Sequence, residues 1–280
     1  MPQNQSALTT ASHSIEPSRR TVLAGAAWSM PIVATAATLP SAAASANCPT
    51  GTFTVQFTTG QGTGNPITLR ATSPSTAEVF TVRITSTLDA GTTVTQSNAN
   101  YNLTQLSSGW NGGYANDGSQ DYVFNDFGRR GALVLNQRKS GTTAASAPGT
   151  DGQQLRFDFF DSAGARIDPT NVQFDIFDIS STDSTPAWRA TYWDAVGFSR
   201  APSAITTTPG KDAGVGAGTI RSPFGRSTGL LPTTAGPWSD QFTFATFPSG
   251  SYMRYTQLGG RQGWHFISVS GLRFDALVPC

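Results

Sequence analysis

The stretch Gln154–Ser199, which reads QLRFDFFDSAGARIDPTNVQFDIFDISSTDSTPAWRATYWDAVGFS, predicts three β-strands separated by turns. In residues 155–159 and 172–176, apolar and polar side chains alternate, which is the two-residue period of a strand with one buried face. Residues 188–198 continue the pattern with Trp, Tyr, Val and Phe, which favour strands. The connecting segments are rich in Asp, Gly, Ser, Asn and Pro, which are typical of turns. We therefore expect three successive strands of one sheet.

The rest of the chain has the same character on both sides of this stretch. Further strand-like segments lie at residues 52–58, 67–71, 78–87, 131–138, 241–247 and 263–277. A count of about nine to eleven strands separated by turn signals is typical of an antiparallel β-sandwich of jelly-roll or immunoglobulin-like kind. We expect one such all-β domain over residues 47–280, with long loops near residues 90–126 and 200–240.

The composition supports a globular domain and excludes some partners. Of 280 residues, 38% are hydrophobic and 12% are charged, which does not fit the high charge of disordered chains. The formal net charge of +1 gives no electrostatic reason to expect nucleic acid or an anionic membrane surface as a partner.

The N-terminal segment has the organisation of an export signal. Arg19 and Arg20 precede a mildly apolar run, and Ala44 and Ala46 supply the small residues that a signal peptidase accepts. The twin arginines resemble the core of a Tat signal, which implies export of a folded chain. We expect a cleaved signal peptide at residues 1–46, no membrane span in the mature chain, and a secreted or cell-surface location.

Cys48 and Cys280 are the only cysteines in the sequence, close to the start of the mature chain and at its end. In an oxidising compartment two lone cysteines most simply form a disulfide, here between the first and last strands of a monomer. Free thiols or an intermolecular bond are the alternatives. Because the mature chain has a single histidine, His265, and no CxxC pair, we do not expect a metal site that uses cysteine or histidine.

Aromatic side chains in the loop-like segments are candidate ligand-binding residues. Flat rings stack on the apolar faces of sugars, and such sites lie on loops or on one sheet face. The candidates are Trp110, Tyr114, Tyr122 and Trp193. The alternative is that these rings pack into the core beneath long loops.

Carboxylate-rich segments make a structural Ca²⁺ ion a further expectation, because Ca²⁺ prefers oxygen ligands from Asp and Asn loops. The candidate ligands are Asn116, Asp117, Asp121, Asp175 and Asp178. The alternative is that these residues cap turns and face solvent. No other cofactor is expected.

A GxSxG motif at Gly225–Gly229 is followed by Asp240 and His265, which is the order of an α/β-hydrolase triad. That motif requires a strand before its serine and a helix after it, whereas Pro223 and Pro232 flank it here. We therefore interpret the match as chance, and His265 as a hydrogen-bonded strand residue.

The segments Val172–Ile179 and Tyr192–Val196 resemble a strand pair of uncharacterised β-sandwich domains in exported actinobacterial surface proteins. The leader segment Trp28–Pro31 resembles the leaders of the same proteins. The resemblance implies fold and export but assigns no catalytic residue. Ser180 stands where an acidic residue is common in those domains, which weakens the argument for a metal ion.

These observations favour a non-catalytic binding module for cell-wall or environmental glycan. The first alternative is a structural or adhesion envelope protein with a protein partner. The second is a glycan-active hydrolase, which requires two carboxylates that face one cleft.

Overall fold

The computed structural model describes residues 48–55, 64–96, 99–100, 102–103, 132–139, 151–182, 192–207, 214–226, 239–260 and 265–280. The chain divides into a unit Met1–Ala43 and a unit Ala44–Cys280, and all described residues belong to the second. The expected signal peptide lies outside the described residues, as does much of the two expected long loops.

All regular structure in the described residues is β. The first half of the chain forms β1 (Thr50–Val55), β2 (Ile67–Thr72), β3 (Val79–Leu88), β4 (Thr92–Thr93), β5 (Thr95–Gln96), β6 (Ala99–Asn100), β7 (Leu133–Lys139) and β8 (Gly152–Phe160). The second half forms β9 (Thr170–Phe177), β10 (Ser181–Thr182), β11 (Tyr192–Phe198), β12 (Ala204–Thr207), β13 (Phe224–Gly225), β14 (Ser239–Thr246), β15 (Tyr252–Gly260) and β16 (His265–Leu277).

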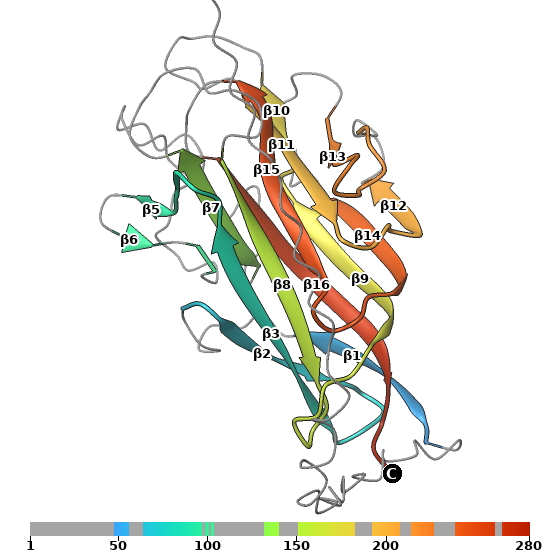
Figure 1. The fold of residues 1–280 in the computed structure, drawn as a ribbon. Coiled ribbons are helices and arrows are strands. Elements are labelled where there is room, and N and C mark those ends of the chain that lie inside the picture. Colours follow the sequence, from blue (N-terminus) through green and yellow to red (C-terminus); the bar gives the residue numbers. More distant parts are fainter. Residues whose placement is uncertain are drawn as a thin grey trace, which may run out of the picture. The chain divides into compact units, whose positions relative to one another are not determined.

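Fourteen of these described strands are hydrogen-bonded into one antiparallel sheet (Figure 1). Its main path runs β10-β11-β15-β8-β3-β2-β1-β16-β9-β14-β12. In addition, β13 pairs with β11, and β7 connects β16 to β4, while β5 and β6 form a separate pair. The predicted antiparallel all-β fold is therefore confirmed.

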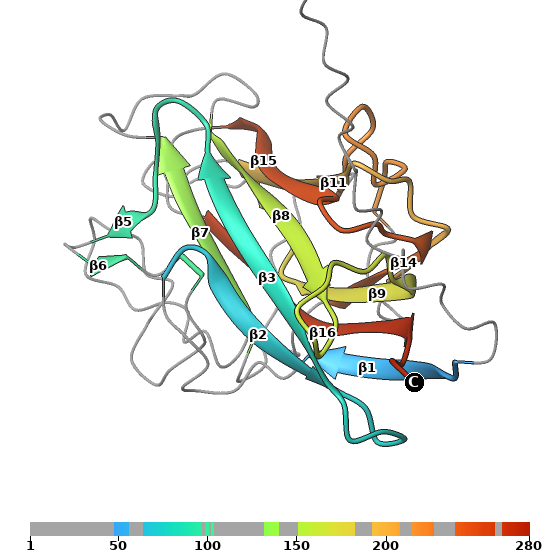
Figure 2. The same ribbon diagram turned by 60° about the horizontal axis from the view of Figure 1, so that its bottom comes forward.

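The sheet curves so that strands far apart along its path face one another across a core of phenylalanine side chains (Figures 1 and 2). The rings of Phe157 in β8 and Phe174 in β9 pack edge to face with centroids 5.0 Å apart. Phe159 in β8 and Phe274 in β16 do the same at 5.2 Å. Each such fully buried ring stabilises the fold by roughly 1.5–3 kcal/mol.

The three strands predicted from the opening stretch are present in that sheet, as β8, β9 and β11. None of them is a neighbour of another, because β8 lies between β3 and β15, and β9 lies between β16 and β14. The predicted inward faces are confirmed: Leu155, Phe157 and Phe159 have no exposed surface. The two-residue period thus predicts which side chains are buried, but it carries no information on strand order.

The hydrophobic pattern of the sequence does not predict one of the long strands, β15. Its inward face carries Tyr255 and Gln257 beside Met253, while Tyr252 and Arg254 lie on the other face. Aromatic and polar side chains therefore occur on both faces, which removes the period-two signal.

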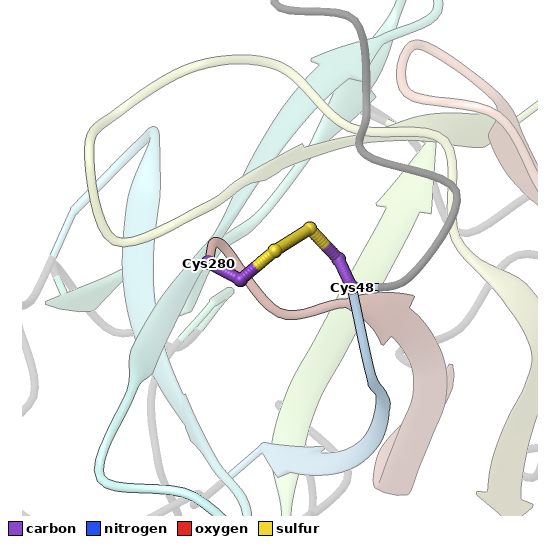
Figure 3. Close-up of a disulfide and its surroundings, with 2 residues drawn as sticks. All are labelled: Cys48 and Cys280. Carbon is purple, nitrogen blue, oxygen red and sulfur yellow. A yellow bond between two sulfur atoms is a disulfide. The ribbon is translucent and has the colours of Figure 1, made fainter.

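The disulfide expected between Cys48 and Cys280 is present and joins residues 232 positions apart, with 5.6 Å between their Cα atoms (Figure 3). It lies next to the pair Thr50 and Leu277, where β1 is in register with the end of β16. Closing a loop of this length stabilises the fold by about 5 kcal/mol in the chain-entropy model. The predicted connection of the first and last strands is confirmed.

Candidate functional site

Four side chains form a buried polar cluster near the start of β16: Asp151, Asp194, Tyr255 and His265. The His265 Nε2–H donates to Asp151 Oδ2 at 2.6 Å, and its Nδ1 lies 3.0 Å from Asp194 Oδ1. The Tyr255 hydroxyl donates to the same Asp194 oxygen at 2.8 Å. All four residues are at most 3% exposed.

These residues come from different parts of the curved sheet. Asp151 directly precedes β8, Asp194 lies in β11 and Tyr255 lies in β15, and these three strands are neighbours. His265 is the first residue of β16, which lies further along the sheet path. The imidazole therefore connects two facing parts of the sheet at this end of the core.

His265 is an imidazolium ion at neutral pH. Burial acts to lower the pKa of His265, but hydrogen bonds to Asp151 and Asp194 and the charges of both carboxylates outweigh it and raise this pKa to about 10. Burial raises the pKa of Asp194, against the opposing effect of His265. Burial and the nearby Asp194 charge raise the pKa of Tyr255 well above its usual value, so the phenol remains a donor.

Arg226 and Asp240 form a second buried charged group, an ion pair whose side chains have no exposed surface. Arg226 Nη2 donates to Asp240 Oδ2 at 2.6 Å, and its Nε donates to the Ile179 carbonyl at 2.9 Å. The Thr207 hydroxyl donates to Asp240 Oδ1 at 2.8 Å. This pair joins the segment after β13 to β14, β12 and the end of β9.

Asp178 is a buried carboxyl that interacts electrostatically with both Arg226 of the ion pair and Asp194 of the polar cluster. It follows β9 with a φ of 66°, a left-handed backbone conformation that is uncommon outside glycine. Burial and the Asp194 charge raise the pKa of Asp178 well above its ordinary value, against opposing effects of Ser180 and Arg226. Burial therefore favours the protonated form of the Asp178 carboxyl.

A second network, which we call the amide chain, consists of Asn102, Ser86, Gln153 and Gln137. Asn102 Nδ2 donates to Ser86 Oγ at 3.4 Å, and Ser86 Oγ donates to Gln153 Oε1 at 2.9 Å. Gln153 Nε2 donates to Gln137 Oε1 at 3.2 Å. Gln153 is paired with Tyr255 in the β8–β15 register, so the amide chain lies beside the polar cluster.

The amide chain holds both flanks of segment 104–131, which contains three of the candidate aromatic residues. Asn102 lies just before this segment, and Gln137 lies in β7 just after it. The two flanks also contact each other, because Leu103 N–H donates to the Val134 carbonyl at 2.8 Å. The ends of the segment are therefore fixed to β3 and β8 by buried hydrogen bonds.

Most of the sequence-predicted site residues lie in parts of the chain that the structure does not describe. Trp110, Tyr114, Tyr122, Asn116, Asp117 and Asp121 lie outside the described residues. Trp193 lies in β11 opposite Ser181, and its side chain is likewise not described.

Of the two described calcium candidates, Asp175 accepts a hydrogen bond from Gln241 Nε2 at 3.0 Å, whereas Asp178 belongs to the buried network. Within the described ranges, no group of three or more His, Cys, Asp or Glu side chains is arranged to hold a metal ion.

The GxSxG reading gains no support from the described geometry. His265 is held by Asp151 and Asp194, and Asp240 is held by Arg226 and Thr207, so the two do not form the dyad that a triad requires. Ser227 lies outside the described residues. His265 is a hydrogen-bonded strand residue, as expected.

Asp151, Asp194, Tyr255 and the amide chain are not predicted from the sequence. One available signal was the presence of polar residues inside strand-like runs, such as Asp194 within YWDAVGF and Gln153 at the start of β8. A buried polar residue must find a partner, but the sequence does not say which.

None of the described residues belongs to a helix with the length and apolar character needed to cross a membrane. Comparison of the chain with protein-family models, with curated proteins and with solved structures finds no match.

Proposed function

We propose that this chain is an exported, non-catalytic binding module that recognises glycan, on a β-sandwich scaffold of jelly-roll or immunoglobulin-like kind. The observation that carries the proposal is the amide chain, which fixes both flanks of the aromatic-rich segment 104–131. A binding loop with anchored ends loses less conformational entropy when a ligand binds. Loops placed by a rigid scaffold are the usual location of binding residues.

Export is supported by the Cys48–Cys280 disulfide, because such bonds persist in oxidising compartments. The twin-arginine leader identified in the sequence provides the route to such a compartment. The proposal includes a structural Ca²⁺ ion only at Asn116, Asp117 and Asp121.

A catalytic role is less well supported by the described residues. Asp151 and Asp194 converge on His265, as acid–base groups do, but their side chains are 1% exposed. A general acid or base must come within hydrogen-bonding reach of its substrate. The polar cluster therefore fits a role in holding strands together better than a role in hydrolysis.

Strand addition by a protein partner is also less well supported. Within the part of the chain that the structure describes, the main sheet path ends in β10 and β12, which are two and four residues long. Such short edge strands offer few backbone groups for a partner strand.

The proposal is tested by binding of the purified full chain to a panel of polysaccharides and purified cell walls, with Ca²⁺ and with chelator. We expect saturable binding that is weakened about tenfold or more by Trp110→Ala or Trp193→Ala, because truncating an aromatic residue that anchors a ligand costs about 2 kcal/mol or more. The control is Val215→Ala, which removes an exposed apolar side chain of the described part. Absence of binding to every glycan would contradict the proposal.

A further inference from the structure

A diagonal row of arginines crosses the outer face of the sheet, one on each of four neighbouring strands. The four residues are Arg70 in β2, Arg83 in β3, Arg156 in β8 and Arg254 in β15, and Figure 2 shows these strands side by side in this order. We call these residues the arginine row.

The strand register defines the geometry of the arginine row. The opposed pairs are Arg70–Thr81, Thr68–Arg83, Thr85–Arg156 and Gln154–Arg254. Each arginine is therefore displaced by two residues from the one on the next strand. Because side chains alternate between faces with a period of two, all four share one face, and consecutive members lie about 7–8 Å apart.

This face is turned to solvent. The side chain of Arg156 is 47% exposed, that of Arg254 is 35% exposed, and Arg70 and Arg83 are also exposed. The opposite face of the same strands carries the core residues Phe80, Val82, Ile84, Leu155, Phe157 and Met253. Threonine hydroxyls lie between the arginines, at Thr81 and Thr85.

The face is strongly cationic for a chain whose net charge is +1. Arg166 adds a fifth guanidinium, and its Nη2 lies 3.2 Å from Asp158 Oδ1. Among the described residues, the carboxylates that contact these guanidinium groups are Asp158 and Asp89, which are fewer than the five arginines. A surface with more cations than carboxylates attracts polyanions.

The existing contacts show that guanidinium groups of this face bind carboxylates. Arg156 and Arg166 both contact one oxygen of Asp158, and Arg254 contacts both oxygens of Asp89 through its two terminal nitrogens. Guanidinium groups bind carboxylates through such parallel hydrogen bonds. Phe160 lies beneath Arg83, with 5.0 Å between the guanidinium carbon and the ring centroid, which restrains that side chain.

We propose that the arginine row binds the carboxylates of an acidic polysaccharide, a polyuronate whose chain lies along the diagonal from β2 to β15. The inference rests on the proposed function, in that the ligand is a glycan, and it names the class of glycan and the surface. A regular row on the solvent-facing side of the sheet fits an extended polymer with repeated charges, and the threonine hydroxyls between the arginines are available to its hydroxyl groups.

The test is a titration of the purified full chain with polygalacturonate, with neutral dextran, and with inorganic polyphosphate and single-stranded DNA as other polyanions. We expect polygalacturonate to bind most tightly, and Arg83→Ala/Arg156→Ala to weaken its binding by about tenfold or more, because two charge-assisted contacts are lost. Arg83→Lys/Arg156→Lys keeps the charge but loses the paired hydrogen bonds, so an intermediate loss is expected.

The matched control is Arg221→Ala/Arg273→Ala, which removes two exposed arginines outside the four strands and is expected to change affinity by less than about twofold. An unchanged near-ultraviolet circular dichroism spectrum verifies that each variant is folded.

Three results would overturn the inference. The first is a loss of polygalacturonate affinity in the control variant as large as that in Arg83→Ala/Arg156→Ala. The second is tighter binding of polyphosphate or DNA than of polygalacturonate. The third is wild-type polygalacturonate affinity in Arg83→Ala/Arg156→Ala. If the chain bound only neutral glycan, and Trp110→Ala weakened that binding, the proposed role of the arginine row would be wrong and the proposed glycan-binding function would stand. Binding to no glycan would contradict both.

Discussion

At the scale of single residues, the fold places ions inside its core and neutralises them with specific partners. His265 holds its charge because Asp151 and Asp194 contact its two ring nitrogens. Removing one member of such a buried group is costly, because the remaining charges lose their partner in a medium of low polarity. The polar cluster is therefore a sensitive point of the structure although it is remote from solvent.

We expect His265→Gln to destabilise the fold by about 3–5 kcal/mol, because two carboxylates remain buried without a cation. Urea unfolding at pH 7 measures this free energy. Arg273→Gln, an exposed position on the same strand, is the control and is expected to change it by less than about 0.5 kcal/mol. Equal effects of the two substitutions would show that His265 is not held as an ion.

The pH dependence of stability follows from the same residues. The pKa of His265 rises from 6.5 when unfolded to about 10 when folded, so its stabilising effect is complete below pH 6.5 and is lost as the pH rises through 10. The raised pKa values of Asp178, Asp194 and Tyr255 act in the same direction, since each favours the protonated folded state.

We therefore expect the free energy of unfolding to fall steadily from pH 6 to pH 10. Urea titrations at fixed pH values measure it, with the disulfide kept oxidised. In His265→Gln the slope between these pH values should be clearly smaller. A wild-type stability that is constant or rises across this range would contradict the assignment.

At the scale of elements, β16 carries much of the architecture, because it pairs with β1, β7 and β9. The register between β16 and β9 shifts after Ser270, and the next residue, Gly271, has a φ of 62°. A Cβ atom at Gly271 would clash with the Asp175 carboxylate. This bulge allows one long strand to follow a curved sheet.

We expect Gly271→Ala to destabilise the fold by about 3 kcal/mol, through a left-handed backbone and the clash with Asp175. Gly164→Ala is the matched control, because Gly164 also has a positive φ, of 82°, but has open space at its Cβ position. That variant should lose only about 1 kcal/mol. Thermal and urea unfolding compare the two, and equal losses would mean that the clash is relieved without cost.

Much of the element-scale picture could be predicted from the sequence, and the exceptions have physical causes. Alternation predicts the buried faces of β3, β8, β9 and β14 wherever the inward residues are apolar, as at residues 80–84, 155–159, 172–176 and 242–244. It fails for β15, where Tyr255 and Gln257 face inward, and for the amide chain. A polar residue can be buried where the fold supplies a hydrogen-bond partner. The partner is usually distant in the sequence, so the alternation pattern does not reveal it.

At the scale of the whole Ala44–Cys280 unit, β16 is fastened at both ends. The disulfide holds its C-terminal end to the start of β1, and the polar cluster holds its first residue to β8, β11 and β15. The sequence predicts the pairing of Cys48 with Cys280 as the simplest of three alternatives, because there is no other cysteine, and the structure shows that bond. The second fastening could not be predicted in this way, since it depends on residues of β11, β15 and β16 and on Asp151, which directly precedes β8.

We expect Cys48→Ser/Cys280→Ser to lose up to about 5 kcal/mol of unfolding free energy, the loop-closure value for 232 residues. Urea unfolding with and without reducing agent measures this. Reduction of the wild type should reproduce the loss and leave the variant unaffected. A variant as stable as the oxidised wild type would show that the connection adds no stability.

The most direct test of the account is glycan binding by the full chain compared with two variants, each at a temperature where it is folded. Gln153→Met breaks the amide chain that holds segment 104–131, and Cys48→Ser/Cys280→Ser removes the disulfide. We predict that the wild type binds glycan, that Gln153→Met weakens binding about tenfold, and that the disulfide variant retains wild-type affinity. No binding by the wild type, or equal affinity in Gln153→Met, would contradict the claim that this chain is a glycan-binding module with anchored loops.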